Sequence, residues 1–337
     1  MLTLDVRVGE PVQRGALTLF PLLTPAAQPS GAGTPAVSAD EPSTDTGGTA
    51  EPAYLPGPVA FERDLLEVTE LDSGAEVARL CAVNCAPVPV LLVEGEHILG
   101  AKQNRTLNVS VLVGAGRTVE IPVSCVEAGR WGAPAATRLA PRHSPSSVRR
   151  HKTSSVARSA RTTRRRTSDQ AGVWAHVSHL EHRFEALSPS AALDDVFEHR
   201  QADLADTVAS LEPVEDQVGV VVAVGGRIEA LDLFDRPDTL AAFWEGLVNG
   251  YALDALDLTT DPEVPAEEAR VFLAEVAAAD VERQPGVDLG TDLFLEGPTV
   301  TGVGLEWDGA LRHLAAFRLA PDEHPSRPWR DRGPGRC

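Results

Sequence analysis

Two pairs of apolar segments, each joined by a two-residue turn, constrain this 337-residue chain most strongly. The paired segments are 217–224 with 227–234 and 299–307 with 310–319. Gly225-Gly226 and Asp308-Gly309 separate the partners, and these residue types accept the positive φ that a tight hairpin turn needs. The sequence therefore predicts two antiparallel hairpins in the second half of the chain.

Further strand-like segments occupy the first half. Short apolar or alternating runs occur at 65–71, 75–84, 88–93, 107–113 and 119–126, with turn residues at 94–95 and 114–116. This spacing is typical of a β-rich meander that forms a barrel or a sandwich. Two more runs, 2–8 and 17–23, are expected to be N-terminal strands of the same core that pair with later segments.

The second half also contains segments with a helical period. Apolar residues recur at intervals of three and four from Val173 to Leu187, and a second stripe runs from Leu193 to Leu211. Ser188-Pro189 separates these two predicted helices. Further helices are expected at about 238–256 and 266–282. The sequence thus predicts an α+β fold with a β-rich core, several helices and the two hairpins.

Charge is unevenly distributed along this acidic chain. The formal net charge is −19, yet residues 138–166 contain ten Lys or Arg and no acidic residue. An acidic surface argues against nucleic-acid binding, and the basic segment lacks aromatic residues for base stacking. Because small polar residues fill much of it, we expect a solvated or mobile segment.

Composition also divides the chain into domains and tails. Residues 25–53 are mostly Ala, Pro, Ser, Thr, Gly and acids, and residues 321–337 combine Arg with Pro and Gly. Neither stretch has an apolar period, so both are expected to be disordered. The expected folded domain therefore consists of the strands within residues 1–24 and of residues 54–320, including the basic segment.

Composition also bears on location and on metal binding. No apolar run approaches the ~20 residues that cross a bilayer, and the N-terminus has no basic start or apolar stretch, so a cytoplasmic protein without membrane partners is expected. Its four cysteines are too few for a disulfide framework. Cys81 and Cys85 share one face of a predicted strand, but no second pair completes a zinc site.

The densest polar chemistry lies between residues 94 and 131. Its acids are Glu94, Glu96 and Glu127, its bases are Lys102, Arg105 and Arg130, and Gln103 and Asn104 add groups that both donate and accept. Consecutive strands can bring these residues into one cluster. Two interpretations stay open, because such a cluster is either a buried ion-pair network that stabilises the fold or a ligand site.

Two long motifs cover this region. The strings EGEHILGAKQNRTLN and IPVSCVEAGRW resemble those of the family described as the ADP-ribosylglycohydrolase and rhodanese-phosphatase associated protein domain. Further similarity extends from Tyr54 to Phe317 and includes Asp169-Gln170, the Gly225-Gly226 hairpin and the HLAAF string of the last strand. Departures are the insertion at 25–53 and the Arg-rich stretch 161–166.

The family name implies an association with domains that act on ADP-ribose and on phosphate esters. By that association, the resemblance suggests a role near nucleotide or ADP-ribose chemistry. The residue types suit such a ligand, since Lys102, Arg105 and Arg130 can hold a diphosphate and Trp131 can stack on a base. Asp232, which follows the Gly-Gly turn, is a further candidate ligand-binding carboxylate.

Two residues are candidates for catalysis. Glu127 has the chemistry of a general acid or base. Cys125 is a candidate nucleophile if neighbouring cations lower its pKa, although a small buried core residue is the alternative. Three histidines at steps of three, His176, His179 and His182, are interpreted as the solvated side of a helix rather than as metal ligands.

Common hydrolase motifs are absent. The chain has no GxxxxGKS/T phosphate loop, no GxSxG elbow and no HExxH motif. Our leading hypothesis is a ligand-binding domain, or an enzyme, for a nucleotide or ADP-ribose-like phosphorylated anion at residues 94–131. The alternative is a non-catalytic sensor or scaffold, which a closed and self-paired cluster beside Arg105 and Glu127 would favour. The sequence specifies neither a cofactor nor an oligomeric state.

Overall fold

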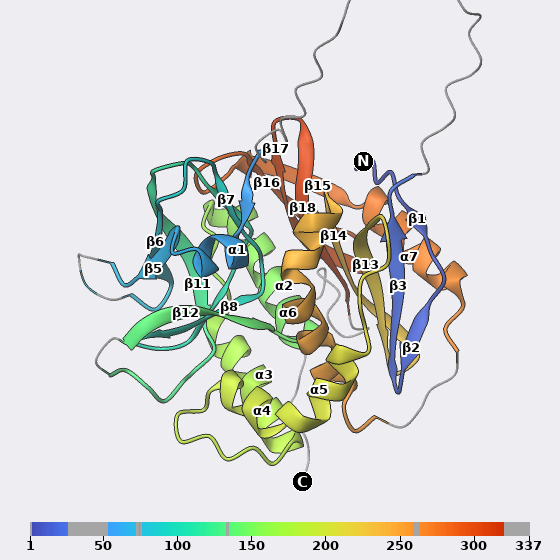
Figure 1. The fold of residues 1–337 in the computed structure, drawn as a ribbon, viewed down its shortest axis with the longest axis horizontal. Coiled ribbons are helices and arrows are strands. Elements are labelled where there is room, and N and C mark those ends of the chain that lie inside the picture. Colours follow the sequence, from blue (N-terminus) through green and yellow to red (C-terminus); the bar gives the residue numbers. More distant parts are fainter. Residues whose placement is uncertain are drawn as a thin grey trace, which may run out of the picture.

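The computed structural model describes residues 2–25, 53–71, 74, 76–132, 135–258 and 263–319, in which three β-sheets and seven helices form (Figure 1). The predicted α+β class with a β-rich core is confirmed. The predictions of disorder at 25–53 and 321–337 fall almost wholly outside the described residues. Within the described residues, no helix is long and apolar enough to cross a membrane.

The largest sheet joins the N-terminal strands to the second half of the chain. Its order is β1-β3-β13-β14-β18-β17-β16-β15, with β2 also paired to β3. The strands are β1 (Arg7–Val8), β2 (Val12–Arg14), β3 (Leu17–Leu23), β13 (Gln217–Val224), β14 (Arg227–Phe234), β15 (Asp280–Pro285), β16 (Thr291–Glu296), β17 (Val300–Trp307) and β18 (Ala310–Arg318). All of these neighbours are antiparallel.

The first half of the chain forms two smaller sheets. A six-stranded sheet has the order β12-β8-β9-β11-β6-β5, and a three-stranded sheet has the order β10-β7-β4. The strands are β4 (Leu55–Pro56), β5 (Leu66–Thr69), β6 (Arg79–Asn84), β7 (Val90–Leu92), β8 (Glu96–Ala101), β9 (Arg105–Leu107), β10 (Val111–Val113), β11 (Thr118–Cys125) and β12 (Ala135–His143). The predicted run 107–113 is thus divided between two sheets.

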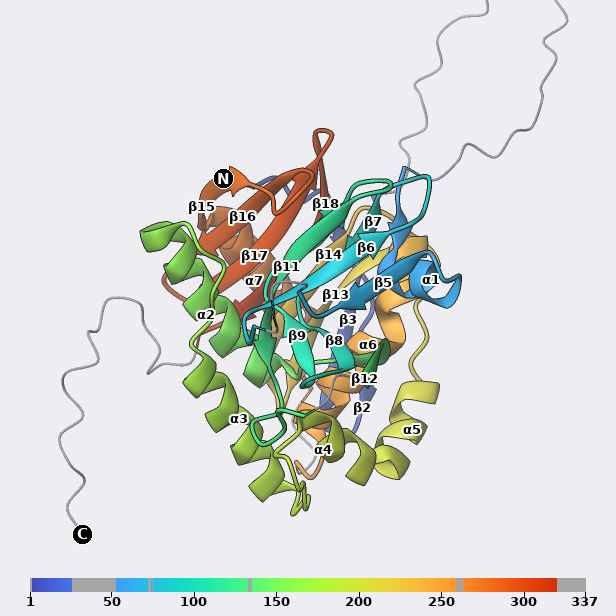
Figure 2. The same cartoon turned by 90° about the vertical axis from the view of Figure 1, so that its left-hand side faces the viewer.

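Seven helices surround these sheets in the described part of the chain. They are α1 (Gly57–Glu62), α2 (Ser146–Thr163), α3 (Gln170–Arg183), α4 (Leu193–His199), α5 (Gln201–Ala209), α6 (Pro237–Ala255) and α7 (Ala266–Ala278). Helices α2 and α6 both contact the large sheet, and α7 contacts strands of that sheet as well (Figure 2). Helix α3 extends from α2 towards α4 in the same view.

Both predicted hairpins are confirmed. Gly225 and Gly226 have φ values of 60° and 73°, and Asp308 and Gly309 have φ values of 51° and 72°. Two consecutive positive φ values match the right-handed twist of the flanking strands, which explains the register of β13 with β14 and of β17 with β18.

Helix boundaries differ from the predictions at two places. The apolar stripe from Leu193 to Leu211 is divided into α4 and α5, because Arg200 has φ −104° and ψ 13° and interrupts the helix. The predicted helix 266–282 ends at Ala278, and Asp280 begins strand β15. Pairing with β16 at the edge of the large sheet therefore outweighs the helical pattern in those last residues.

The expectation of a solvated or mobile basic segment at 138–166 is wrong. Residues 135–143 form β12, which pairs with β8, and residues 146–163 form α2. Helix α2 packs against β16, β17 and β18, and Val148 and Val156 are fully buried. Two of its cations, Arg149 and Lys152, are also buried, and their partners lie far away in the sequence.

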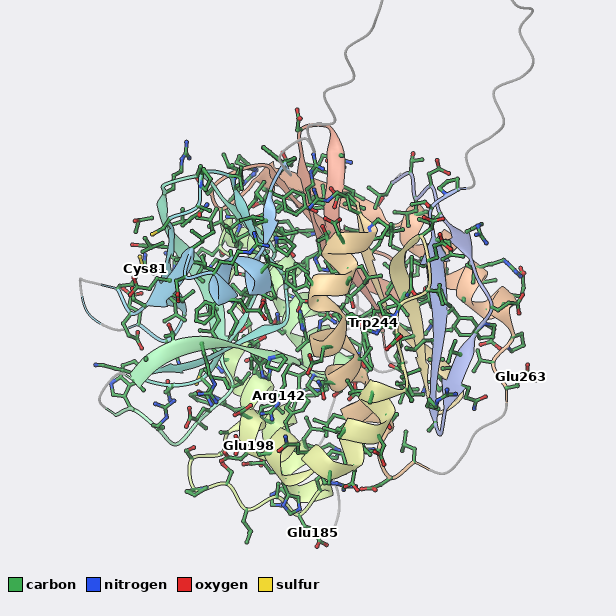
Figure 3. The ribbon with its side chains drawn as sticks, in the orientation of Figure 1. Cys81, Arg142, Glu185, Glu198, Trp244 and Glu263 are labelled. Carbon is green, nitrogen blue, oxygen red and sulfur yellow. The ribbon has the colours of Figure 1, made fainter. Side chains whose placement is uncertain are left out.

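Apolar residues lie on both faces of the large sheet. One cluster fills the space between this sheet, the smaller sheets, α2 and α6, and a second cluster lies under α7. Side chains fill the spaces between the elements (Figure 3). Trp244 of α6, labelled there, is buried and donates from Nε1 to the carbonyl of Leu211 at 2.7 Å.

Candidate functional site

The structure separates the predicted site residues into two groups. Glu94 and Asp232 join an inner network, which we define as Glu94, Arg149, Lys152, Asp232, Tyr251 and His313. The other group, the motif cluster, comprises Lys102, Gln103, Asn104, Arg105, Cys125, Glu127, Arg130 and Trp131. Glu96 belongs to neither group.

The inner network balances two cations against two carboxylates. Arg149 donates from Nε to Glu94 at 2.9 Å and contacts both oxygens of Asp232, at 2.7 and 3.0 Å. Lys152 lies 2.6 Å from the second Glu94 oxygen. All four side chains are at most 1% exposed. Such charges are tolerated only when they neutralise one another, as they do here.

Two further side chains complete the contacts of Asp232. The Tyr251 hydroxyl hydrogen-bonds Asp232 and lies 3.1 Å from an Arg149 nitrogen. His313 Nε2 lies 3.2 Å from Asp232, and its Nδ1 lies 2.7 Å from the hydroxyl of Ser110. Burial raises the pKa of Asp232, but Arg149 and His313 lower it by more than burial raises it. The pKa therefore lies well below its usual range, and the carboxyl is ionised.

Sequence reasoning missed the two cations of this network. Arg149 and Lys152 are three residues apart and therefore project from one face of α2. Gly95 is a sequence signal of this contact. It has a φ of +89°, and a Cβ atom there would lie only 2.6 Å from the side chain of Arg149, so only glycine fits. Without the fold, however, nothing links that glycine to α2.

Glu96 is a separate buried acid on β8. Its carboxyl is 1% exposed, and one oxygen accepts from the backbone N–H of Val93 at 3.1 Å. Burial raises its pKa to about 8, so the group is mainly a neutral acid at pH 7. Burial likewise lowers the pKa of the neighbouring His97 to about 3, with smaller effects from Arg142 and Lys152. Both side chains are therefore neutral parts of the core.

The motif cluster is built around Glu127. Its carboxylate accepts from Arg130 at 2.8 and 2.7 Å, from the backbone N–H of Asn104 at 2.8 Å and from Ser190 at 2.7 Å. Burial raises the pKa of Glu127, but these hydrogen bonds, led by that of Arg130, lower it below the usual value. Glu127 is therefore an ionised acceptor whose oxygens are already occupied.

Arg130 also holds the turn between β8 and β9. Its guanidinium donates to the carbonyls of Gly100 and Ala101 at 3.2 and 3.1 Å and to the side-chain oxygen of Asn104 at 3.2 Å. Gly100 and Ala101 have φ values of 95° and 49°, which tighten this turn. The GAKQNR and VEAGRW motifs thus meet because one arginine ties the turn to the end of β11.

Arg105 and Cys125 lie behind this turn and are fully buried. Arg105 donates to the carbonyl of Val77 at 3.1 Å and lies 3.7 Å from the sulfur of Cys125. Burial lowers the pKa of Arg105 and raises that of the Cys125 thiol, which donates to the carbonyl of Glu127 at 2.9 Å. Gln103 donates to the same carbonyl at 2.9 Å. A protonated, enclosed thiol is a weak nucleophile.

Lys102 and Trp131 form the exposed rim of the motif cluster. The ammonium of Lys102 lies 5.3 Å from the centre of the Trp131 ring, and 51% of Trp131 is exposed. Within the described residues, the Lys102 side chain makes no ion pair, and its backbone N–H donates to Glu70 at 2.8 Å. Arg130, whose side chain is 30% exposed, is the third group of this rim.

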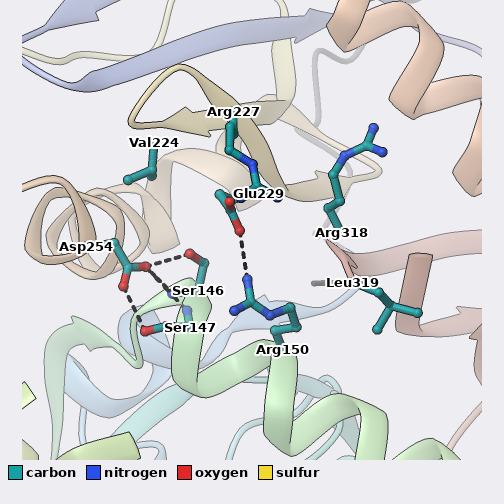
Figure 4. A pocket seen from close by; sticks show the side chains of 9 residues that line it. All are labelled: Ser146, Ser147, Arg150, Val224, Arg227, Glu229, Asp254, Arg318 and Leu319. Atoms are coloured by element: carbon teal, nitrogen blue, oxygen red, sulfur yellow. Dashed lines mark hydrogen bonds and ion pairs between the residues drawn. The ribbon is translucent and has the colours of Figure 1, made fainter. Parts of the chain in front are cut away.

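Five surface pockets lie between described elements. No residue of the motif cluster, and so neither Arg105 nor Glu127, lines any of them. One of these, at the start of α2, has a volume of about 160 Å³ (Figure 4). There Asp254 accepts from the N–H and hydroxyl of Ser146, and Arg150 pairs with Glu229 at 2.7 Å. It is smaller than the roughly 300–1,000 Å³ of typical ligand sites.

A family model matches residues 5–317, which is most of the chain. Its description is the ARG and Rhodanese-Phosphatase-superfamily-associated Protein domain. The chain belongs to this family. The resemblance carried by the GAKQNR and PVSCVE motifs is confirmed, and the match includes both the motif cluster and the inner network. No curated protein and no solved structure matches the chain.

In this member of the associated-protein family, the histidines of α3 form no metal centre with other described residues. His176 stacks on His151 with ring centres 4.7 Å apart, and its Nδ1 lies 2.9 Å from the carbonyl of Gly172. No group of three or more His, Cys, Asp or Glu that could hold a metal ion occurs in the described part of the chain.

Proposed function

We propose that this domain binds a nucleotide or ADP-ribose-like phosphorylated anion without transforming it, and that the rim of the motif cluster is the binding site. The observation that carries the proposal is the position of Lys102. Its ammonium has no carboxylate partner among the described residues and lies over the half-exposed ring of Trp131.

The three rim groups suit the parts of such a ligand. Lys102 and the exposed edge of Arg130 offer charge and hydrogen bonds to a diphosphate. Trp131 offers a ring face to a base, an arrangement in which stacking is worth about 1–3 kcal/mol per base. The family description, with its reference to ARG and phosphatase proteins, is consistent with this ligand class but names no ligand.

Binding fits the chemistry of the cluster better than catalysis does. Both oxygens of Glu127 accept hydrogen bonds, and its lowered pKa makes it a poor proton donor near neutral pH. The raised pKa of Cys125 keeps its thiol protonated. Neither Glu127 nor Cys125 therefore has the pKa that its candidate catalytic role requires.

A second candidate, a scaffold domain whose polar residues only stabilise the fold, is favoured by the inner network. Its charges cancel and it is enclosed. Arg105 is also fully buried, and both oxygens of Glu127 accept hydrogen bonds from within the protein. None of these residues belongs to the exposed rim, so the two candidates differ in the role of the rim.

Calorimetric titration of the full chain with ADP-ribose, NAD, ADP and inorganic phosphate separates the two candidates. We expect Lys102→Gln to weaken binding by about 10-fold or more, because a hydrogen bond to a charged group is worth roughly 1.5–3 kcal/mol. Arg7→Gln, on the exposed edge strand β1, is the control and should bind like wild type. If wild type bound none of these ligands at millimolar concentration, the ligand-binding proposal would fail and the scaffold candidate would remain.

A further inference from the structure

A large pocket lies on the other side of the motif cluster. It is enclosed by β6, β11, the connection between α2 and α3, and the turn between β15 and β16, elements that lie near one another in Figure 2. Its volume is about 650 Å³, which is within the roughly 300–1,000 Å³ of small-molecule sites. Lys102, Arg130 and Trp131 do not line it, so it is separate from the rim described above.

Three arginines and two glutamates provide its charged lining. They are Arg79, Arg165 and Arg166 with Glu76 and Glu120. An excess of cations is unusual on a chain whose formal net charge is −19. The apolar part of the lining includes Pro122 and Val287.

The arginines differ in how their charge is used. Arg79 pairs with Glu76 at 2.7 Å and also with Glu120, and all three side chains are 43–54% exposed. Arg166 pairs with the buried Asp292. Arg165 is exposed and makes neither an ion pair nor a side-chain hydrogen bond to any described residue. One cation of the pocket is therefore free for an anion.

Two buried residues of the GAKQNRTLN string support the walls of this pocket. Arg105 holds the carbonyl of Val77, next to the lining residues Glu76 and Ala78, and Asn108 donates to the carbonyl of Arg166 at 2.9 Å. Asn108 in turn accepts from Ser124 at 2.5 Å. Walls fixed from inside the core are preorganised for binding, which reduces the ordering cost of a ligand.

We propose that this pocket binds a phosphorylated ribose-containing small molecule. Phosphate oxygens contact the guanidinium group of Arg165, whose planar donors suit bidentate recognition. Glu120, of whose two oxygens only one accepts from Arg79, accepts a hydrogen bond from a ribose hydroxyl, as acidic residues do in dinucleotide sites. Pro122 and Val287 contact the apolar face of the sugar or base.

This inference shares the ligand class of the proposed function but not its site, and the two can fail separately. Adjacent residues offer a matched pair of variants, Arg165→Gln and Arg164→Gln. Both arginines are exposed and without a side-chain partner among the described residues, but only Arg165 lines the pocket. Titrations of the full chain use ribose 5-phosphate, ADP and ADP-ribose, with inorganic phosphate and ribose as partial ligands.

We expect Arg165→Gln to weaken binding of ribose 5-phosphate at least 10-fold and Arg164→Gln to change it less than 2-fold. Glu120→Gln should weaken ribose 5-phosphate more than inorganic phosphate, because only the former has hydroxyls. Equal affinity of the two arginine variants would overturn the inference. If Lys102→Gln abolished binding while Arg165→Gln had no effect, the inference would fail and the proposed function would stand; absence of any binding by wild type would remove both.

Discussion

The charge balance of the inner network makes a quantitative prediction for Lys152→Met, Glu94→Gln and the double variant. Wild type encloses two cations and two carboxylates. Each single change leaves one uncompensated charge where exposure is at most 1%. Breaking a buried ion pair in this way typically costs about 3–5 kcal/mol of stability.

The two single variants are not equivalent. After Lys152→Met, Glu94 still contacts Arg149, so we expect a loss near the lower limit, about 3 kcal/mol. After Glu94→Gln, the Lys152 ammonium keeps only the carbonyl of Leu107, so we expect about 5 kcal/mol. The double variant restores neutrality and should lose at least ~1 kcal/mol less than the sum of the two, which is a typical coupling for residues in contact.

Urea denaturation followed by circular dichroism measures these free energies. Arg7→Gln, on an exposed edge strand, is the control and should stay within about ±0.5 kcal/mol of wild type. The reasoning is refuted if the single losses add to the double loss within ~0.5 kcal/mol, since charges that do not interact behave in this way. Single losses below ~1 kcal/mol would also refute it, because they would mean that water reaches the network.

Two further predictions concern other charged or titratable residues. The pKa of Glu96 is raised from 4.5 to about 8, so the native state binds its proton more tightly than the unfolded state does. Its contribution to stability is therefore fully present below pH 4.5 and is lost as pH rises to 8, at about 1.4 kcal/mol for each pKa unit. Glu96→Gln should remove this decline, and denaturation at pH 5 and pH 8 measures the difference; a wild-type decline that persists in the variant would contradict the assignment. Glu127→Ala should cost about 3–5 kcal/mol, because Arg130 loses its carboxylate partner. Arg105→Ala should cost a similar amount, because it removes a large, fully buried side chain and leaves the Val77 carbonyl without its donor. Unchanged midpoints for both would show that these side chains are solvated.

The parts of the fold that the sequence predicted are those governed by local chemistry. Gly225-Gly226 and Asp308-Gly309 define their hairpins because few other residue pairs accept two positive φ values. The helix at 238–256 was also correct to within a residue or two, since Pro237 begins α6 and Ala255 ends it. No knowledge of distant residues was needed for any of these elements.

The basic segment could not be assigned in this way. Helix α2 is too polar to show a clear apolar stripe, because Arg149 and Lys152 occupy positions that face the core. Their burial is compensated by Glu94 and Asp232, which lie 55 and 83 residues from Arg149. A buried cation is recognisable only together with its anion, so this helix becomes interpretable only once the tertiary structure is known.

Tertiary contacts also divide the predicted site residues between the inner network and the motif cluster. Glu94 lies in the turn before β8 and faces α2, whereas Glu127 follows β11 and accepts from Arg130 and Asn104. Among the motif residues between them, Arg105 and Asn108 donate hydrogen bonds to backbone carbonyls in the wall of the 650 Å³ pocket. Enclosed residues fix the backbone, and neighbours such as Arg165 and Trp131 are the ones exposed to solvent.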